Sequence, residues 1–349
     1  MKDITVLITA AGNVFMPGTT ACLKNNGERN IKLVGVDMND DPTMLNMVDT
    51  YYAVPRGDDP TYIEVLMDIC KREKVDVILP IMSVELEKLS MNLDKFESIG
   101  TKVSVSNISG LRVANDKLKL LLHMKSKGYP CAQFYSVRNL DELKTSVIKL
   151  GYPKNKVCVK ATNASGSRGF RILDANTSMY DKFFCDKPSS SEIKLEDFCK
   201  ILAERDSFPE LLVMEYLSGT EFTVDALADN GKVIECCCRK GLRMENSIML
   251  DSQVVDRKDI NKICSDIIAD LKLDGNIGFD IKERADGTPI IMECNPRITA
   301  GIPVFYYAGV NLPYLCVKKI LGEELPESKL KYGMIVRRRW QEMVSQTTH

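Results

Sequence analysis

The sequence predicts an α/β fold in its N-terminal part and an α+β fold in the remainder. Between Ile4 and Leu79 short apolar strands alternate with helix patterns, which is typical of a parallel sheet with crossover helices. From about Pro130 the strand patterns follow one another more closely, which indicates antiparallel sheet. The clearest of these is a hairpin whose turn is Asp286-Gly287, a preferred two-residue turn sequence.

The first part is expected to contain three strands and two helices that form one parallel sheet. The expected elements are a strand at Ile4–Thr9, a helix from about Thr19, a strand at Lys32–Asp37, a helix at Pro60–Lys74 and a strand at Val75–Leu79. Ligands bind beyond the carboxyl ends of such strands, where Thr9–Asn13, Asp37 and Ser83–Glu85 lie. Gly12 and Gly18 lack the Gly-x-Gly-x-x-Gly spacing, so dinucleotide binding is disfavoured.

The second part is expected to combine antiparallel strands with helices packed on them. The expected strands are Val157–Lys160, Phe170–Leu173, Leu212–Leu217, Phe222–Leu227 and Val233–Arg239. The expected helices are Ser109–Lys127, Glu192–Glu204, Asp256–Leu271 and Leu312–Leu321, the last ending at Gly322, and residues 186–191 are expected to form a surface loop.

Composition excludes several classes of function. The chain has 349 residues, enough for two or three domains, and its 47 basic and 48 acidic residues give a net charge of −1, so no global field favours nucleic acid or an anionic membrane. No stretch approaches a membrane span or a signal peptide. The 12 cysteines lack a Cys-x-x-Cys pair and only 2 histidines are present, which argues against structural zinc and predicts buried thiols in a reducing cytoplasm. A redox role for residues 236–238 is left open.

The hairpin pairs two acids. If Ala285 lies opposite Thr288, then Asp280 lies opposite Glu293, and two facing carboxylates with Cβ atoms about 5 Å apart repel each other. Asn295 falls on the same face, and Pro296 then ends the strand and turns Arg297 toward the same end. Two carboxylates and an amide oxygen suit Mg²⁺. The alternative is an exposed hairpin with solvated acids.

A lysine followed by small residues is a second candidate element. Lys160 ends an apolar strand, and the small residues that follow it up to Gly169 would let backbone N–H groups approach phosphates. The stretch is not a P-loop, because Gly-Lys-Ser/Thr is absent. A glycine-rich hairpin beside a solvated lysine would give the same pattern.

The order of these elements resembles the ATP-grasp superfamily. An Asp116-Lys117 pair precedes Lys160 and its small-residue loop, then Val213–Glu221 and finally the acidic hairpin. Within the superfamily the chain looks most like the branch of the carbamoyl-phosphate synthase large subunit and the carboxylate–amine ligases. The resemblance implies a parallel α/β pre-ATP-grasp domain followed by a two-lobed ATP-grasp fold. The implied division is 1–110 for the first domain, 111–211 for a linker helix and the lobe with the lid, and 212–349 for the lobe with the metal hairpin and a C-terminal tail.

The resemblance also implies the cofactors, ATP and Mg²⁺ or Mn²⁺, and the residues that hold them. Implied ATP-binding residues are Lys117 and Lys160 at the phosphates, Ser165, Gly166, Ser167, Arg168 and Gly169 in a mobile lid, Glu215, Tyr216 and Leu217 at the adenine, and Glu221 at the ribose. Implied metal ligands are Asp280, Glu293 and Asn295. Lys160, Arg239 and Arg297 are the catalytic candidates: the ammonium group of Lys160 supplies a charge at the phosphates, and the guanidinium groups of the two arginines suit both phosphate and carboxylate. Plainer roles are sheet core for Tyr216 and Leu217 and solvent exposure for Glu215 or Glu221. Arg243 is a further arginine of this kind, for which an exposed strand edge is favoured.

The function implied is an ADP-forming carboxylate–amine ligase that acts through an acyl phosphate on small-molecule substrates, without nucleic acid or membrane. A component like carbamoyl-phosphate synthase, acting on bicarbonate or carbamate, is one alternative; a single ATP-grasp unit without a glutaminase signature would make it a split subunit. A non-catalytic nucleotide-binding regulator is the alternative from another class. Homo-oligomerisation is left open.

Overall fold

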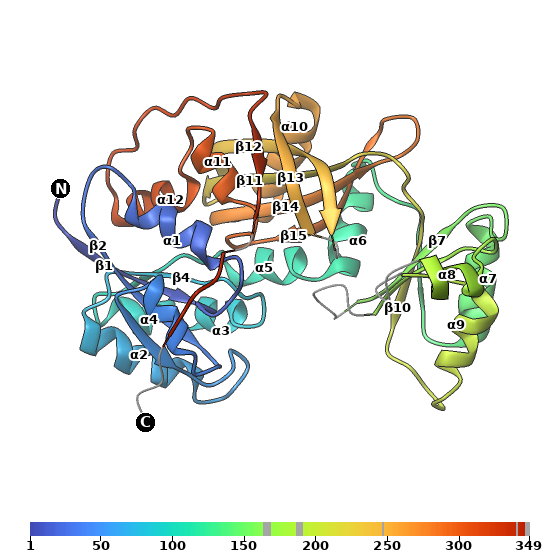
Figure 1. Cartoon of the computed structure of the whole chain (residues 1–349), viewed down its shortest axis with the longest axis horizontal. Helices are drawn as coiled ribbons and strands as arrows, with labels where there is room; N and C mark the ends of the chain where they lie inside the picture. Colours follow the sequence, from blue (N-terminus) through green and yellow to red (C-terminus); the bar gives the residue numbers. More distant parts are fainter. Residues whose placement is uncertain (163–168, 186–190, 246–247, 340, 346–349) are drawn as a thin grey trace.

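The computed structural model describes residues 1–162, 169–185, 191–245, 248–339 and 341–345. Its strands form three sheets (Figure 1). The first and third sheets lie together, and the second sheet forms a separate lobe on the right of Figure 1 that extended segments join to the rest. The predicted order, a parallel α/β domain followed by a two-lobed mixed region, is confirmed.

The first sheet is parallel, with strand order β3-β2-β1-β4-β5. Its strands are β1 (Ile4–Thr9), β2 (Ile31–Asp37), β3 (Thr50–Ala53), β4 (Val77–Leu79) and β5 (Lys102–Val103). Its helices are α1 (Met16–Lys24), the 3-10 helix η1 (Pro42–Asn46), α2 (Tyr62–Glu73), α3 (Leu86–Met91) and α4 (Leu93–Glu97). The central strands are apolar on both faces because helices cover both, which is why they are nearly continuous hydrophobic runs in the sequence.

The second sheet has the order β6-β10-β7-β8-β9 and is antiparallel except for the pair β8 and β9. Its strands are β6 (Phe134–Val137), β7 (Val157–Ala161), β8 (Phe170–Leu173), β9 (Glu192–Ile193) and β10 (Leu211–Glu215), and its helices are α7 (Leu140–Lys149), α8 (Met179–Cys185) and α9 (Leu195–Leu202). The predicted domain boundary between residues 211 and 212 lies inside β10. Because β10 belongs to the second sheet, the chain passes to the third sheet only after Glu215.

The third sheet is antiparallel, with the order β15-β14-β11-β12-β13-β16. Its strands are β11 (Glu221–Asp229), β12 (Lys232–Glu245), β13 (Ile248–Val255), β14 (Gly275–Glu283), β15 (Pro289–Asn295) and β16 (Ile335–Arg337). Its helices are α10 (Lys258–Leu271), α11 (Pro303–Tyr307) and α12 (Leu312–Leu321), the last ending at Gly322 in the left-handed region as predicted. β12 is longer than the predicted strand at Val233–Arg239.

Two predicted helices are wrong in detail. The helix predicted at Ser109–Lys127 is two helices, α5 (Ile108–Ala114) and α6 (Lys117–Lys127), because Asp116 takes an extended conformation and caps α6 through the backbone N–H of Lys119. The helix predicted at Glu192–Glu204 begins only at Leu195, because the first residues pair with β8 as strand β9.

The hairpin of β14 and β15 closes through a loop one residue longer than predicted. The backbone N–H of Arg284 donates to the carbonyl of Thr288 at 3.0 Å, so Ala285 lies in the loop and does not pair with Thr288. Gly287 has a φ of +85°, the left-handed position of such three-residue loops. A bulge at Met292 then restores the predicted register, and Asp280 pairs with Glu293.

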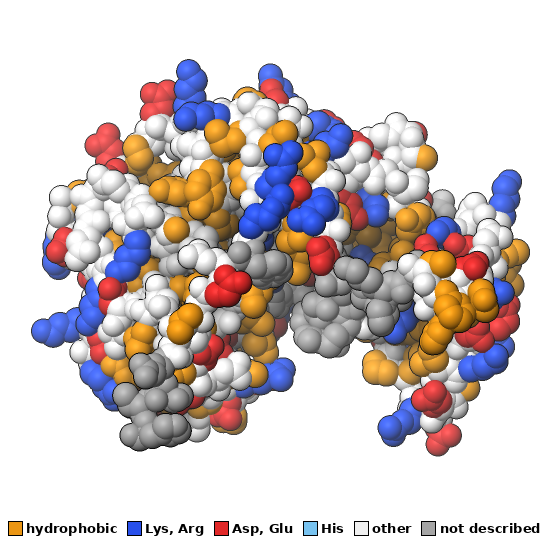
Figure 2. All heavy atoms as spheres, in the orientation of Figure 1, with side chains coloured by type: hydrophobic (Ala, Val, Ile, Leu, Met, Phe, Trp, Pro, Cys, Tyr) orange, Lys and Arg blue, Asp and Glu red, His pale blue; other side chains and the backbone are white. Residues whose placement is uncertain are grey.

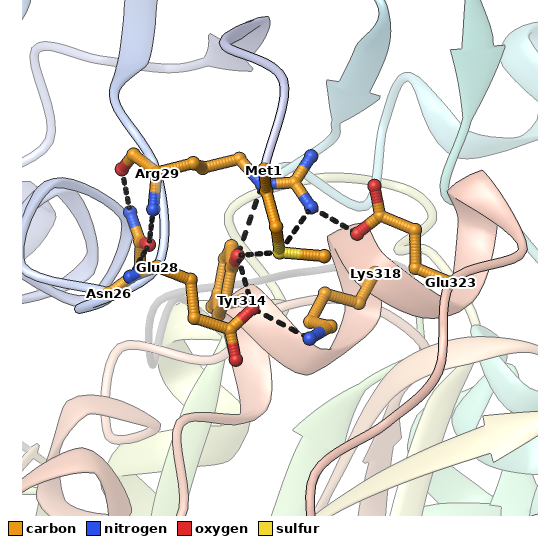
Figure 3. Close-up of polar contacts among 7 residues, drawn as sticks. All are labelled: Met1, Asn26, Glu28, Arg29, Tyr314, Lys318 and Glu323. Carbon is orange, nitrogen blue, oxygen red and sulfur yellow. Dashed lines mark hydrogen bonds and ion pairs between the residues drawn. The ribbon is translucent and has the colours of Figure 1, made fainter.

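Contacts between the first domain and α12 fix the two parts together (Figure 3). Tyr314 donates its hydroxyl to the Glu28 carboxylate at 3.0 Å and accepts from Nε of Arg29 at 3.1 Å. The Arg29 guanidinium also pairs with Glu323, and Lys318 Nζ lies 2.6 Å from the Glu28 carboxylate. One apolar core runs beneath these contacts and includes strands of the first and third sheets. The carboxyl ends of the first sheet are thereby held beside the acidic hairpin.

Candidate active site

The acids of the hairpin form the centre of the candidate site. Thr223 Oγ1 donates to one carboxylate oxygen of Asp280 at 3.4 Å, and Asn295 Nδ2 donates to the other at 3.3 Å. The Asp280 side chain borders solvent, but the protein around it removes much of its hydration. That dehydration, with the negative charge of Glu293, raises the pKa of Asp280 to about 6. Positive charge placed between the two acids would relieve this repulsion.

Two lysines approach the same acids from other elements. Lys117 is the first residue of α6, and its Nζ lies 3.5 Å from the Glu293 carboxylate. Lys160 lies near the end of β7 in the second lobe, where burial lowers its pKa and the charges of Glu293 and Asp280 oppose that shift. Three segments far apart in the sequence thus bring both predicted phosphate-binding lysines toward the predicted metal ligands.

Arg297 connects the hairpin to the first domain. One terminal nitrogen of Arg297 donates to Asn295 Oδ1 at 3.0 Å, and its Nε donates to Ser83 Oγ at 3.1 Å. Ser83 follows β4, so it belongs to a segment predicted to lie at the carboxyl edge of the parallel sheet. The structure therefore brings that edge and the hairpin into one site.

The other segments at this edge are held by buried acids. Gly12 donates its backbone N–H to Asp37 Oδ2 at 2.9 Å. Glu85 is buried and accepts hydrogen bonds from Thr9 Oγ1 at 2.5 Å and from the Tyr62 hydroxyl, while burial raises its pKa. With its oxygens occupied in this way, Glu85 ties the loops after β1 and β4 to each other.

The predicted nucleotide hinge has paired acids. The Glu215 carboxylate lies 2.6 Å from Arg284 and accepts from the backbone N–H of Gln133 at 3.0 Å. The Glu221 carboxylate lies 2.8 Å from Lys282 Nζ, which is also 5.6 Å from the ring centre of Tyr216. A pocket of about 470 Å³ opens beside Glu221, and its lining residues are Ser218, Gly219, Thr220, Glu221, Lys240, Gly241, Leu242, Met244 and Lys282.

Leu217 is buried, at 3 % exposure, in an apolar cluster just beyond β10, and a buried side chain is compatible with both roles considered for it. The predicted lid residues Ser165, Gly166, Ser167 and Arg168 lie outside the described residues. Gly169 is described; its carbonyl accepts from the backbone N–H of Ala161 at 2.9 Å and its φ is +67°.

Several groups at the site were not predicted from the sequence. Thr223 contacts Asp280, and Lys282 and Arg284 neutralise the hinge acids. Thr223 on β11 lies opposite Asp280 on β14. The alternation of side chains along β11 could have identified Thr223 as a site residue only if the pairing of these two strands, which are distant in sequence, had been known. Arg239, a predicted catalytic candidate, is buried on β12 at 4 % exposure. Asp225 on β11 was not among the predicted site residues, and it is buried close to Arg239.

The donor set fits a hard cation. Within the described ranges no group of three His, Cys, Asp or Glu side chains is placed to hold a metal. The candidate ligands are instead two acids and an amide, Asp280, Glu293 and Asn295, whose oxygens are of the type that Mg²⁺ prefers. The Asn295 amide now directs its nitrogen toward Asp280; a half-turn would direct its oxygen there instead and would give up the hydrogen bond from Arg297.

The fold is that of ATP-grasp proteins, and comparisons with known proteins agree. Residues 207–342 match the family model described as "ATP-grasp in the biosynthetic pathway with Ter operon". Residues 6–104 match the model "PylC-like, N-terminal domain". The chain therefore carries an ATP-grasp domain behind a PylC-like N-terminal domain, and the resemblance found in the sequence is confirmed.

Several known proteins are similar to this chain over most of its length. The carbamoyl phosphate synthase large chain of Clostridium acetobutylicum is 25% identical over 287 residues, which cover 78% of this chain and 24% of that protein. The chain thus spans about a quarter of the length of the curated relatives it matches. N5-carboxyaminoimidazole synthetase from Staphylococcus aureus, solved with ADP, has a TM-score of 0.68 at 17% identity and covers 95% of this chain and 81% of its own. L-amino acid ligase from Bacillus licheniformis has a TM-score of 0.64 at 15% identity, with 92% and 75% covered.

The described part of the chain contains no helix with the length and apolar character needed to span a membrane.

Proposed function

We propose that the protein is an ATP-dependent, ADP-forming ligase that joins a small-molecule carboxylate to an amine through an acyl phosphate. The observation that carries this proposal is the pairing of Asp280 with Glu293 in a site that also receives Lys117 and Lys160. Two facing acids beside two lysines suit a divalent cation and the phosphates of a nucleotide. The ATP-grasp domain and the ligases among the similar structures support the same class of reaction.

The reaction would proceed in two displacements. An oxygen of the acid attacks the γ-phosphorus and ADP leaves; the amine nitrogen then attacks the acyl carbon, phosphate leaves, and the amine loses a proton. Lys117 and Lys160 would hold phosphate oxygens, and Arg297 and Arg239 would balance charge on the transferred group or the substrate carboxylate. Mg²⁺ held by Asp280, Glu293 and Asn295 would supply further positive charge. No side chain needs to act as a covalent nucleophile.

A second candidate is a component like carbamoyl-phosphate synthase that phosphorylates bicarbonate or carbamate. The 25% identity to the large chain favours it, and the match to only 24% of that protein's length would make this chain part of a larger system. ATP turnover that depends on bicarbonate alone would select it. A non-catalytic nucleotide-binding regulator would bind ATP and release no ADP with any acid and amine.

Glu293→Gln tests the proposal, because it removes a metal-binding charge at constant volume. ADP release over pooled carboxylates and amino acids should fall about 100-fold or more, with an unchanged circular dichroism spectrum. Glu283→Gln is the matched control, since Glu283 lies on the same hairpin and pairs with Arg257 at 2.7 Å. Near-normal turnover of Glu293→Gln at ordinary Mg²⁺ concentrations would refute the metal assignment.

A further inference from the structure

Helix α8 of the second lobe carries a group of exposed apolar side chains. None of its seven residues, all of which the structure describes, is buried. Its large apolar residues are Phe183, Tyr180, Phe184 and Met179, with exposed fractions of 79%, 72%, 66% and 52%. The ring centres of Tyr180 and Phe184 lie 4.7 Å apart, and those of Phe183 and Phe184 lie 4.9 Å apart. Figure 2 shows an apolar patch over α8, on the lobe at the right.

The orientation of α8 is the reverse of that of an ordinary surface helix. At about 100° per residue, the four apolar residues share one face of α8, within an arc of about 140°. Lys182 lies on the opposite face, and its Nζ is 3.0 Å from the Glu192 carboxylate of the same lobe. An amphipathic helix normally turns its apolar stripe toward the core and its charges toward solvent. In α8 the lysine is held by the lobe and the aromatic rings face outward.

The exposed apolar area on α8 is that of a protein interface. With about 200 Å² of surface for each aromatic side chain, the exposed fractions of the four residues correspond to about 500 Å² of apolar area. Contiguous apolar patches of this size on a protein surface mark interaction sites. An interface of standard size buries about 800 Å² on each partner, of which about 60% is apolar. The patch on α8 therefore supplies the apolar area that one partner of such an interface contributes.

The chemistry of the patch suits a second copy of the same chain. Aromatic rings attract one another in offset and edge-to-face arrangements, and a methionine thioether also packs well against rings. A patch built from one kind of side chain is complementary to itself about a twofold axis, the commonest symmetry of soluble oligomers. The net charge of −1 adds almost no repulsion between copies. An anionic membrane would instead require basic residues around the patch, whereas the exposed charged residue of α8 is Asp181.

We propose that two copies of the chain associate through α8, with the apolar faces of the two helices packed against each other about a twofold axis. The contact belongs to the second lobe, which Figure 1 shows apart from the first and third sheets, so the acidic hairpin of each copy lies outside it. The association is independent of the ligase activity proposed above and is tested without substrates.

Sedimentation equilibrium of the full chain measures the association directly. Over a range of about 1 to 100 μM protein we expect a monomer–dimer equilibrium with a micromolar or smaller dissociation constant, because interfaces of standard size give affinities from micromolar to picomolar. A chain that stays monomeric over this range overturns the proposal. Cosedimentation of that monomer with phosphatidylcholine vesicles would then assign the patch to a membrane surface instead.

Phe183→Asp should raise the dissociation constant of the dimer about 100-fold or more, because it buries two like charges where two rings would meet. Met91→Asp is the matched control, since Met91 is 66% exposed on α3 of the first domain and the charge change is the same. Both positions are exposed, so circular dichroism and the melting temperature should not change. Normal dimerisation of Phe183→Asp overturns the proposal, and equal weakening in both variants does so by attributing the effect to net charge.

Discussion

At the scale of single residues, the candidate site depends on charges that are close together but incompletely balanced. Asp280 and Glu293 repel each other, and Lys117 offsets only part of that charge. Arg297 is held by an amide, a hydroxyl and a carbonyl and by no carboxylate within 4.0 Å in the described part of the chain. Its positive charge therefore remains available to an anionic ligand.

Arg297→Lys should lower turnover strongly, about 100-fold, while the affinity for ATP changes little. A lysine keeps the charge but cannot hold two anionic oxygens and the Ser83 hydroxyl with one planar group. Steady-state ADP release and calorimetry with an ATP analogue measure the two effects separately. Arg243→Lys, at an exposed pair with Asp251, is the control. Lost ATP affinity with normal turnover at saturating ATP would place Arg297 in nucleotide binding.

At the scale of elements, two irregularities of the hairpin compensate each other. The extra residue in the loop shifts the pairing by one, and the bulge at Met292 shifts it back before Glu293. Without the bulge, Glu293 would point to the opposite face of the sheet, because side chains alternate along a strand. The start of α6 matters in the same way, since Lys117 is its first residue and Asp116 its cap.

Asp116→Ala should lower the free energy of unfolding by about 1 kcal/mol, because the N–H of Lys119 loses its acceptor. The frayed first turn should also raise the KM for ATP, since Lys117 is no longer fixed beside Glu293. Chemical denaturation and steady-state kinetics measure the two effects. Asn139→Ala removes the comparable cap of α7, away from the site, and should reproduce only the stability loss. Equal KM values for the two variants would contradict the role given to α6.

At the scale of the whole molecule, the first domain and α12 behave as one structural unit. Their shared apolar core and the polar cluster in Figure 3 keep Ser83 within reach of Arg297. The second lobe shares a separate cluster with α6 and the hairpin. Its position determines how closely Lys160 approaches the acids.

The cluster around Glu28 should make stability depend on pH. Hydrogen bonding to Lys318 lowers the pKa of Glu28, so its contribution is complete above the unfolded pKa of about 4.3 and is lost as the pH falls through the lower folded value. Glu28→Gln should therefore cost about 1 kcal/mol of unfolding free energy at pH 7 and less at pH 3, because the pair is partly exposed. Denaturant titrations at both pH values test this. A difference that grows on acidification would have the wrong sign.

The sequence by itself determined the class of fold and the central acids. The apolar strands at Ile4–Thr9 and Lys32–Asp37 are buried on both faces, so their pattern predicted the parallel sheet directly. The parallel sheet depends on short stretches of chain, where local geometry leaves few alternatives. The facing of Asp280 and Glu293 was predicted from a two-residue turn, and it holds because the longer loop and the bulge at Met292 compensate each other. The roles implied for the nucleotide hinge and the lid, and the three-domain division, stay predictions.

Tertiary structure decided what depends on contacts between distant segments. The bulge at Met292, the edge strand β16 and the pairing of Glu215 with Arg284 have no local signal, because each is set by a partner elsewhere in the chain. One charge cluster shows the same dependence. Asp225 lies on β11, Arg239 on β12 and Arg338 directly after β16, and only sheet pairing and the loop after β15 bring the three together. The members of such a cluster are far apart in the sequence. The hydrophobic periodicity of each segment predicts its own helix or strand but not which distant side chains it will contact.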